Sequence, residues 1–380
     1  MPLAKARKHF YAGDFARADQ ALATLPDPDK DKILWLMERG TIRQAQGRYA
    51  ASAADWRTAT DLDRRLEAYS LTEGAASLVV NDMAQSFRGE PFERVLLYAF
   101  LAKSYLAEAN WDYAAIAARN IIDKLENRDG FPDDPYSRYV AGLCLELIAD
   151  RGNAAIQYRA ASELLTTLSI DQDTGWFSRR APTNETALAA PPPVARPPRG
   201  PDRAELVCLV MIGRSPTGRQ AAHGYLPNRT PPYAEFYCRG RYLGRSWPLT
   251  TVTELINETA AKKAGVRAAK TVARVVIKDS VADAVADDHP ILGALLYVVL
   301  MAAESPDTRR WETLPDCLQV ARVDCPADLD GYQVVFRGLD GPAAQRTVTA
   351  PIVRRGRVFV SFCRDLAPRS LPEEVPEKNH

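Results

Sequence analysis

Ser215 and His223 are the residues with the clearest potential for covalent chemistry. Ser215 lies in "GRSPTGR", residues 213–219. In hydrolases, a serine hydroxyl activated by a histidine and oriented by a distant aspartate performs acyl transfer. The stretch lacks the Gly-Lys-Ser/Thr of a phosphate loop. It also fails the G-x-S-x-G pattern, because Pro216 follows the serine and the next glycine comes one position late. We therefore interpret it as a surface loop after a buried strand, with a serine hydrolase using Ser215 and His223 as an alternative.

The cysteines and histidines are not spaced as metal ligands. No Cys-x-x-Cys pair is present, and a zinc site needs clustered ligands, so we expect no metal site and no cofactor. We interpret the thiols as small buried apolar groups, mostly in strands, with one or two disulfides as the alternative in an oxidising compartment. The six cysteines are Cys144, Cys208, Cys238, Cys317, Cys325 and Cys363.

A basic stripe is predicted on a long helix over residues 252–286. Five cations follow one another at spacings of 4, 3, 4 and 4 residues, which places them on one helical face. They are Lys263, Arg267, Lys270, Arg274 and Lys278. Such a stripe could bind an anionic envelope surface or an acidic partner. The alternative is the solvated face of an amphipathic helix.

The stretch "DTRRWETLP", residues 307–315, concentrates charge around one aromatic side chain. Asp307 and Glu312 could pair with Arg309 or Arg310. Trp311 could cover a helix end against a sheet. No nucleophile or histidine lies nearby in the sequence. We expect a structural corner that fastens a helix to a sheet, with a partner-binding patch as the alternative.

The N-terminal half must position these residues, and it is predicted to be helical over residues 3–168. "GDFARADQAL" begins at residue 13 and is echoed by "GRYAASAADW" 34 residues later, at residue 47. The signature residues are Gly13, Phe15 and Ala18, and then Gly47, Tyr49 and Ser52. Weaker echoes begin at residues 111 and 152. This period is typical of the tetratricopeptide repeat, in which two antiparallel helices meet at a tight turn.

The close approach of the helices in each pair is predicted to need small residues. Gly40 and Gly142 occupy the small-residue position of two first helices. Stacked helical pairs form a curved solenoid whose concave face commonly holds a peptide or protein. The alternative is that the helices only support the second half of the chain. In the interruption before residue 92, Glu93 and Arg94 are candidates for a structural ion pair.

The second half has a different pattern. We predict a repeat domain over 1–170, a proline-rich linker over 171–203, an α+β domain over 204–366 and a disordered tail over 367–380. The linker carries seven prolines within 179–202.

The α+β domain is expected to contain a mostly antiparallel sheet and two packed helices. "ELVCLVMIG" (205–213) reads as a buried strand, and "YAEFYCRG" with "RYLGRSW" as a hairpin around Gly240. Four further strands after residue 316 are predicted to form a meander.

Bulk composition excludes little. Lys and Arg number 49 against 48 Asp and Glu, so nothing demands a nucleic-acid partner. The longest apolar run, residues 291–303, is shorter than the roughly 20 residues that span a bilayer, so we expect no transmembrane segment. The first 15 residues lack the apolar core of a signal peptide. They are compatible with a cytosolic protein or with a chain from which a leader has been removed.

Four stretches together resemble an uncharacterised family of bacterial tetratricopeptide-containing proteins, many of them envelope lipoproteins. They are "ERGTIRQAQGRYAASAADWRTA", "NDMAQSFRGEPFERVLLYAFLAKSYL", "GVRAAKTVARVVIK" and "DTRRWETLPDCLQVAR". With the domain order they cover most of the chain outside the linker. The resemblance implies a location and a class but no catalytic residue, and this chain lacks the family's lipoprotein leader and acylated cysteine.

These observations favour a non-enzymatic protein-binding scaffold of the bacterial envelope, with a protein partner held by the helical repeats. Its location is expected to be the periplasm or the outer membrane if a leader was removed. A cytosolic repeat adaptor and the serine hydrolase remain as alternatives.

Overall fold

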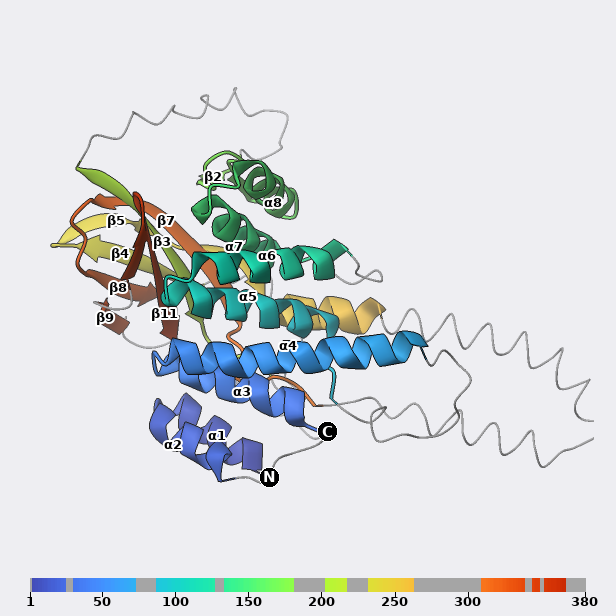
Figure 1. Ribbon diagram of the computed structural model, residues 1–380. Coiled ribbons are helices and arrows are strands. Elements are labelled where there is room, and N and C mark those ends of the chain that lie inside the picture. The colour runs from blue at the N-terminus through green and yellow to red at the C-terminus, as the bar shows by residue number, and fades with distance from the viewer. Residues whose placement is uncertain are drawn as a thin grey trace, which may run out of the picture.

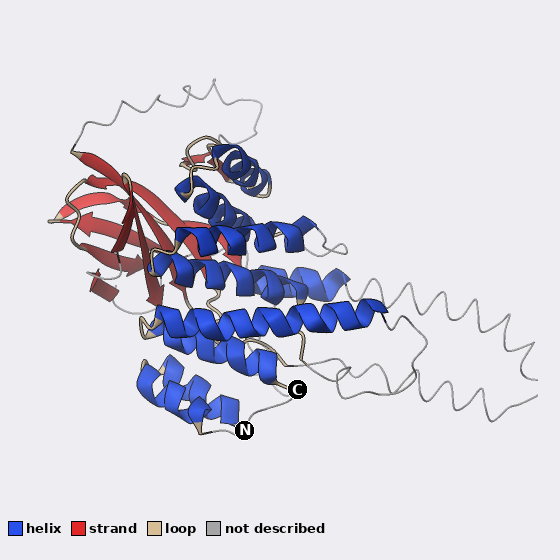
Figure 2. Cartoon of the chain, viewed as in Figure 1, coloured by secondary structure: helices blue, strands red, loops and turns tan. Residues whose placement is uncertain are grey.

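The described residues form a helical N-terminal region followed by a region of mixed β-sheets. The computed structural model describes residues 2–24, 30–72, 87–126, 133–180, 202–216, 232–262, 309–338, 344–348 and 352–366. The prediction of an α+β chain with a helical N-terminal region is confirmed. In Figure 1 the helices stack in chain order from the N-terminus upward, and the sheets lie along one side of the stack, as Figure 2 shows.

The helices form four successive pairs within the described residues. They are α1 (Pro2–Tyr11) with α2 (Phe15–Ala23), α3 (Lys32–Ala45) with α4 (Tyr49–Thr72), α5 (Pro91–Ala107) with α6 (Trp111–Glu126), and α7 (Pro135–Leu147) with α8 (Arg151–Glu163). The second helix of each pair also contacts the first helix of the next, so the pairs form one continuous stack.

All four pairs share one turn geometry. Gly13 and Gly47 have φ angles of 78° and 75°, and Ala109 and Ala149 take the equivalent left-handed positions with φ of 52° and 65°. At each turn, the residue after the left-handed one donates its backbone N–H to a carbonyl five residues earlier, as Asp14 does to His9. Alanine at the last two turns explains why their sequence echoes are weaker.

The strands form three sheets. β1 (Leu168–Ile170) and β2 (Phe177–Arg179) make a two-stranded hairpin beside α8. The five-stranded sheet has the order β10 (Ile352–Arg355), β11 (Val358–Asp365), β3 (Arg203–Ile212), β7 (Cys317–Pro326) and β6 (Trp247–Thr251). The four-stranded sheet has the order β5 (Arg241–Arg245), β4 (Tyr233–Cys238), β8 (Tyr332–Arg337) and β9 (Ala344–Val348).

The sheets are mostly antiparallel, as predicted, and β4 and β5 form the predicted hairpin around Gly240. The predicted meander is wrong. β7 and β8 follow one another in the chain but belong to different sheets, and β11 pairs in parallel with β3. Only one helix of the predicted two lies in the described part, over 252–262; the segment 291–303 and the tail 367–380 lie outside the described residues.

Strand β3 contributes side chains to two hydrophobic cores, one on each of its faces. The helices, the five-stranded sheet and the four-stranded sheet therefore form three layers. Val207, Leu209 and Met211 join a core shared with the helices. Leu206, Cys208 and Val210 join a second core between the two large sheets. Because β3 is covered on both faces, its sequence is an unbroken apolar run. The two halves that the sequence separates therefore share one hydrophobic core.

The predicted linker is wrong over residues 171–180, which form a turn and strand β2. Tyr139 donates a hydrogen bond to the Gly175 carbonyl (2.9 Å), and Trp176 Nε1 donates to Glu205 Oε1 on β3 (3.2 Å). The proline-rich part, residues 181–200, lies outside the described residues.

Candidate functional site

The first helix of each pair faces the C-terminal half of the chain. We call the surface formed by α1, α3, α5 and α7 the inner face. It contacts the five-stranded sheet through α5 and α7, and it contacts residues 309–316 through α1, α3 and α5. We call residues 309–316 the docking segment; it is drawn orange in Figure 1.

Trp311 anchors the docking segment in an aromatic site that the inner face forms together with Trp56 of α4. Its side chain is 1% exposed, and its ring centroid lies 5.3 Å from that of Phe100 and 6.4 Å from that of Trp56. The indole N–H donates to Thr41 Oγ1 at 2.9 Å, so its one polar atom is also satisfied. The tryptophan is thus held by α3, α4 and α5 together.

Carboxylates on the inner face bind the backbone of the docking segment. Glu93 Oε1 accepts from the Trp311 N–H at 2.8 Å, and Glu38 Oε1 accepts from the Glu312 N–H at 3.0 Å. The second oxygen of Glu93 accepts from the Glu90 N–H at 2.7 Å, as the capping box of α5. Burial raises the pKa of Glu93 to about 7, although both backbone hydrogen bonds act to lower it.

Ion pairs hold the docking segment on both sides of Trp311. Arg309 pairs with Asp31 at 2.6 Å, and Arg7 pairs with Glu312 at 2.9 Å and with Glu38 at 2.7 Å. Sequence analysis expected the charges of this stretch to pair with one another; Arg309 and Glu312 both have ion-pair partners in the helical region.

Arg310 and Asp307 are the remaining predicted residues of this stretch. The Arg310 carbonyl accepts from Arg7 Nη2 at 2.9 Å. Asp307 lies outside the described residues. The described part of the stretch has a structural role, because it fastens the sheet region to the helical stack.

A second buried link joins β7 to α7. Arg322 is almost fully buried and donates to Glu146 Oε1 at 2.6 Å and to Glu205 Oε2 at 2.6 Å. Burial acts to raise the pKa of Glu146, but the hydrogen bond and charge of Arg322 outweigh it and lower that pKa below its usual value. Tyr158 of α8 also donates to Glu146, at 2.5 Å.

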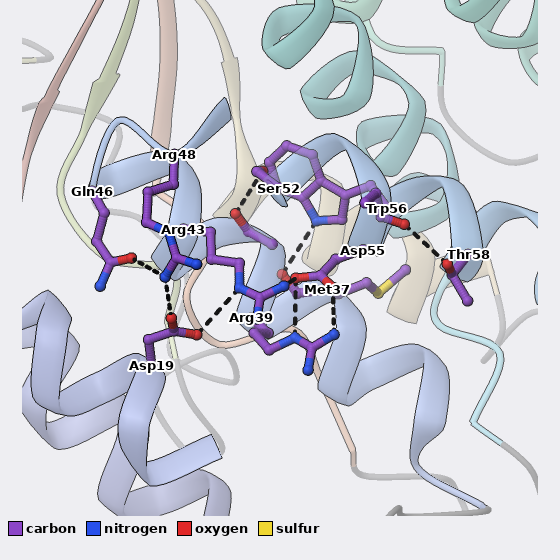
Figure 3. Close-up of polar contacts among 12 residues, drawn as sticks. Asp19, Met37, Arg39, Arg43, Gln46, Arg48, Ser52, Asp55, Trp56 and Thr58 are labelled. Atoms are coloured by element: carbon purple, nitrogen blue, oxygen red, sulfur yellow. Dashed lines mark hydrogen bonds and ion pairs between the residues drawn. The ribbon is translucent and has the colours of Figure 1, made fainter. Parts of the chain in front are cut away.

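A charged network crosses the first two helical pairs (Figure 3). Asp55 of α4 accepts from Arg39 (2.5 Å) and Arg43 (2.8 Å) of α3, while Asp19 of α2 accepts from Arg43 (3.3 Å) and Arg48 (2.6 Å). Each carboxylate bridges two arginines, so α2, α3 and α4 are tied together.

The signature residues of the predicted repeat lie at the turns and in the packing between helices. Ala18 and Ser52 are fully buried, and Ser52 Oγ donates to the Gly40 carbonyl at 2.7 Å. Phe15 and Tyr49 pack half-buried against the same core.

Of the two candidate hydrolase residues, Ser215 lies in the described part of the chain. Ser215 is buried, and its backbone N–H donates to the Leu314 carbonyl at 2.9 Å, which fastens the loop after β3 to the docking segment. His223 lies outside the described residues, as do the basic-stripe residues Lys263, Arg267, Lys270, Arg274 and Lys278. The predicted pairing of Glu93 with Arg94 is wrong, because Arg94 pairs with Glu67 at 2.7 Å.

Sequence analysis missed Glu38 and Lys103, although both carry a signal. Lys103 is the single charged residue of the apolar helical run "VLLYAFLAKSYL", and Glu38 directly follows the apolar run "ILWLM". Both side chains are 1% exposed. A charge in such a run is a buried charge whose partner must come from elsewhere in the fold.

The cysteines are all buried and carry free thiols. Among the described residues, no three His, Cys, Asp or Glu side chains gather as a metal site would require. No helix in the described part of the chain is both long and apolar enough to cross a membrane.

Comparison of the chain with protein-family models and with curated proteins found no match.

Proposed function

We propose that the protein is a non-enzymatic protein-binding scaffold built on tetratricopeptide-like repeats, whose inner face receives an extended peptide segment. The observation that carries the proposal is the docking segment itself. The inner face binds its backbone through Glu38 and Glu93 and its aromatic side chain through Phe100, together with Trp56 of α4. Ion pairs hold Arg309 and Glu312 of the segment.

The regularity of the helical stack supports the same reading. The 34-residue spacing of the first two turns and the shared left-handed residue at all four turns are features of repeat solenoids. The repeats use such a face to recognise peptides, and here a segment of the chain occupies it.

An occupied inner face has a consequence for binding. A covalently attached segment competes with a partner at an effective concentration on the order of millimolar. A partner peptide must therefore displace the docking segment, and it should present an aromatic side chain flanked by charges like those of Arg309 and Glu312.

Binding of the docking segment in trans tests the proposal. A fluorescent peptide with the sequence of residues 307–316 is titrated into the wild-type chain and into Trp311→Ala. The variant should bind it with an affinity at least about tenfold higher than the wild type, because its own segment no longer fills the aromatic site. A peptide with alanine in place of the tryptophan is the control and should not bind.

A second, milder variant keeps the test valid if Trp311→Ala does not fold. Arg309→Ala with Glu312→Ala removes the ion pairs of the docking segment but keeps Trp311, and it should raise peptide affinity to a smaller extent. If both variants keep their circular dichroism spectra and neither binds the peptide, the inner face is a packing surface and the proposal fails.

We further propose a location in the bacterial envelope, which rests on the resemblance described above. The protein from its own cells should fractionate with the envelope, and Lys270→Glu with Arg274→Glu should release it without unfolding it if the basic stripe contributes. The intact mass and N-terminal sequence of the protein from the soluble and membrane fractions test this location. An acylated cysteine upstream of Met1 in the membrane fraction would support it. An unmodified chain found in the cytosol would instead favour the repeat adaptor.

A further inference from the structure

A cavity of about 390 Å³ lies between the helical stack and the two large sheets. Its walls come from the turn between α3 and α4, from α5, and from the ends of β3, β8, β9 and β11. Phe15, Met211 and Phe362 supply apolar surface, while Gln44, Lys103 and Arg364 supply polar atoms. The volume is within the range of small-molecule sites, which is roughly 300–1,000 Å³.

Lys103 is the unusual wall residue. Its side chain is 1% exposed, and its hydrogen bond goes to Met211 Sδ at 3.0 Å, which is a weak acceptor. Its Nζ lies 5.4 Å from the Phe100 ring centroid and 5.6 Å from that of Phe362. The amine is therefore surrounded by sulfur and aromatic rings.

No carboxylate among the described residues balances the charge of Lys103. The groups that act on it are Arg364 and Cys363 of β11 and Cys208 of β3. Burial, and then the charge of Arg364, lower the pKa of Lys103 well below its ordinary value. Tyr49 also lines the cavity, and burial raises its pKa to about 12, so it supplies no negative charge near neutral pH.

Arg364 adds a second, partly exposed cation to the same wall. Its Nη2 donates to the Thr313 carbonyl at 2.5 Å, and its guanidinium lies 4.8 Å from the Phe10 ring centroid. Burial lowers its pKa to about 10, although the charge of Glu38 acts to raise it. Lys103 is fully buried, and a buried cation is costly unless a negative partner is supplied; a ligand in the cavity can supply one.

We propose that this cavity binds one small amphipathic anion, with its carboxylate, sulfonate or phosphate group against Lys103 and Arg364 and its apolar body against Phe15, Met211 and Phe362. Lys103 then acts as the counter-ion and takes up a proton when the anion binds. The site adjoins the docking segment, because Arg364 donates to the Thr313 carbonyl, but it does not depend on the scaffold function proposed above.

Two dyes that differ mainly in charge test the site. 1-Anilinonaphthalene-8-sulfonate carries a sulfonate, and N-phenyl-1-naphthylamine has the same ring system without it. Fluorescence titration of the full chain should show one sulfonate dye bound per chain, with an affinity at least about tenfold above that of the neutral dye. Equal affinity for both dyes would overturn the proposal.

Lys103→Met is the decisive variant because it keeps the length of the side chain and removes the amine. It should lower the affinity for the sulfonate dye at least about tenfold and leave the neutral dye nearly unchanged. Lys5→Met, at an exposed lysine of α1 outside the cavity, is the matched control and should change neither affinity. Unchanged sulfonate binding in Lys103→Met would refute the assignment.

Proton uptake provides a second readout that a purely structural lysine would not give. Calorimetric titration of the sulfonate dye at pH 8 in two buffers of different ionisation enthalpy should show proton uptake in the wild type and none in Lys103→Met. If Lys103→Met does not fold, Phe15→Trp fills the cavity instead and should weaken both dyes. Full dye binding to a folded Phe15→Trp would place the dye elsewhere and end the proposal.

Discussion

In the second helical pair, the indole of Trp56 on α4 fills the space that a side chain at Gly40 of α3 would need. A Cβ atom on residue 40 would lie 2.2 Å from Trp56 Nε1, closer than non-bonded atoms can approach. The indole cannot easily move away, because its N–H donates to the Met37 carbonyl at 3.3 Å. Gly142 and Tyr158 repeat the relationship in α7 and α8 at the same sequence separation, with a Cβ 2.8 Å from the tyrosine ring.

Gly40→Ala should therefore destabilise the protein although alanine favours helices. We expect a loss of about 1–3 kcal/mol in the free energy of unfolding, measured by urea titration, because the indole must leave its site. Gly152→Ala in α8 is the matched control. A Cβ there meets no atom within 4 Å, so the variant should be neutral or gain about 0.5–1 kcal/mol. Equal effects of the two variants would contradict the close packing of Trp56 against Gly40.

Arg322 should be among the most sensitive charged residues of the chain. Arg322→Ala leaves Glu146 and Glu205 without their buried partner, and such a break costs about 3–5 kcal/mol. Arg239→Ala removes an exposed ion pair with Asp328 and should leave the unfolding midpoint unchanged. A small effect of Arg322→Ala would mean that the link between β7 and α7 is not formed in solution.

Glu93 should make stability depend on pH. Burial raises its pKa in the folded protein to about 7, above the ordinary value of 4.5. Its contribution to stability is therefore complete below about pH 4.5 and is lost as pH rises through 7, a change of about 3 kcal/mol at most. Glu93→Gln cannot ionise and should lack this component.

The measurement is the free energy of unfolding of both proteins at pH 5 and pH 8. Other carboxylates with raised pKa values, such as Asp63 and Asp134, contribute equally to both proteins and cancel in the difference. The advantage of the wild type over Glu93→Gln should shrink at pH 8. A difference that does not vary with pH would show that Glu93 is already ionised in the fold at pH 5.

The six thiols should be unreactive in the native protein. All are buried, and burial raises the pKa of Cys325 to about 12, which leaves little thiolate at neutral pH. A thiol reagent should label none within minutes under native conditions and all six after denaturation without reductant. Fewer than six labelled thiols after denaturation would indicate a disulfide, and Cys208 with Cys363, whose sulfurs lie 3.6 Å apart, would be the first pair to test.

Much of the fold could be predicted because its signals are local. The apolar run of β3 predicts a strand buried on both faces, and the glycine between β4 and β5 predicts their hairpin. The first two helical pairs follow from helix-favouring residues and turn glycines, while alanine at the last two turns leaves a weaker signal. The sheet order could not be predicted, because each of β7, β8 and β11 is locally an ordinary strand. Which sheet it joins depends on which core its apolar face completes.

The candidate site shows the same division. The stretch around Trp311 is recognisable from its composition, but its partners Asp31, Thr41 and Glu93 lie more than 200 residues away in the chain. No local pattern encodes such a pairing, so sequence reasoning assigned the charges to one another. Lys103 is likewise visible as a lone charge in an apolar helix, while the absence of a carboxylate around it among the described residues is a property of the packed layers.

The sequence by itself determined the elements: paired helices closed by left-handed turns, an apolar central strand, and charged residues set into apolar helical faces. Only the tertiary structure decided that the inner face of the helical stack is covered by the chain's own sheet and docking segment. The physical reason is that helix propensity, turn conformation and apolar periodicity act over a few residues. The burial of a shared core and the pairing of buried charges depend instead on which distant surfaces exclude water together.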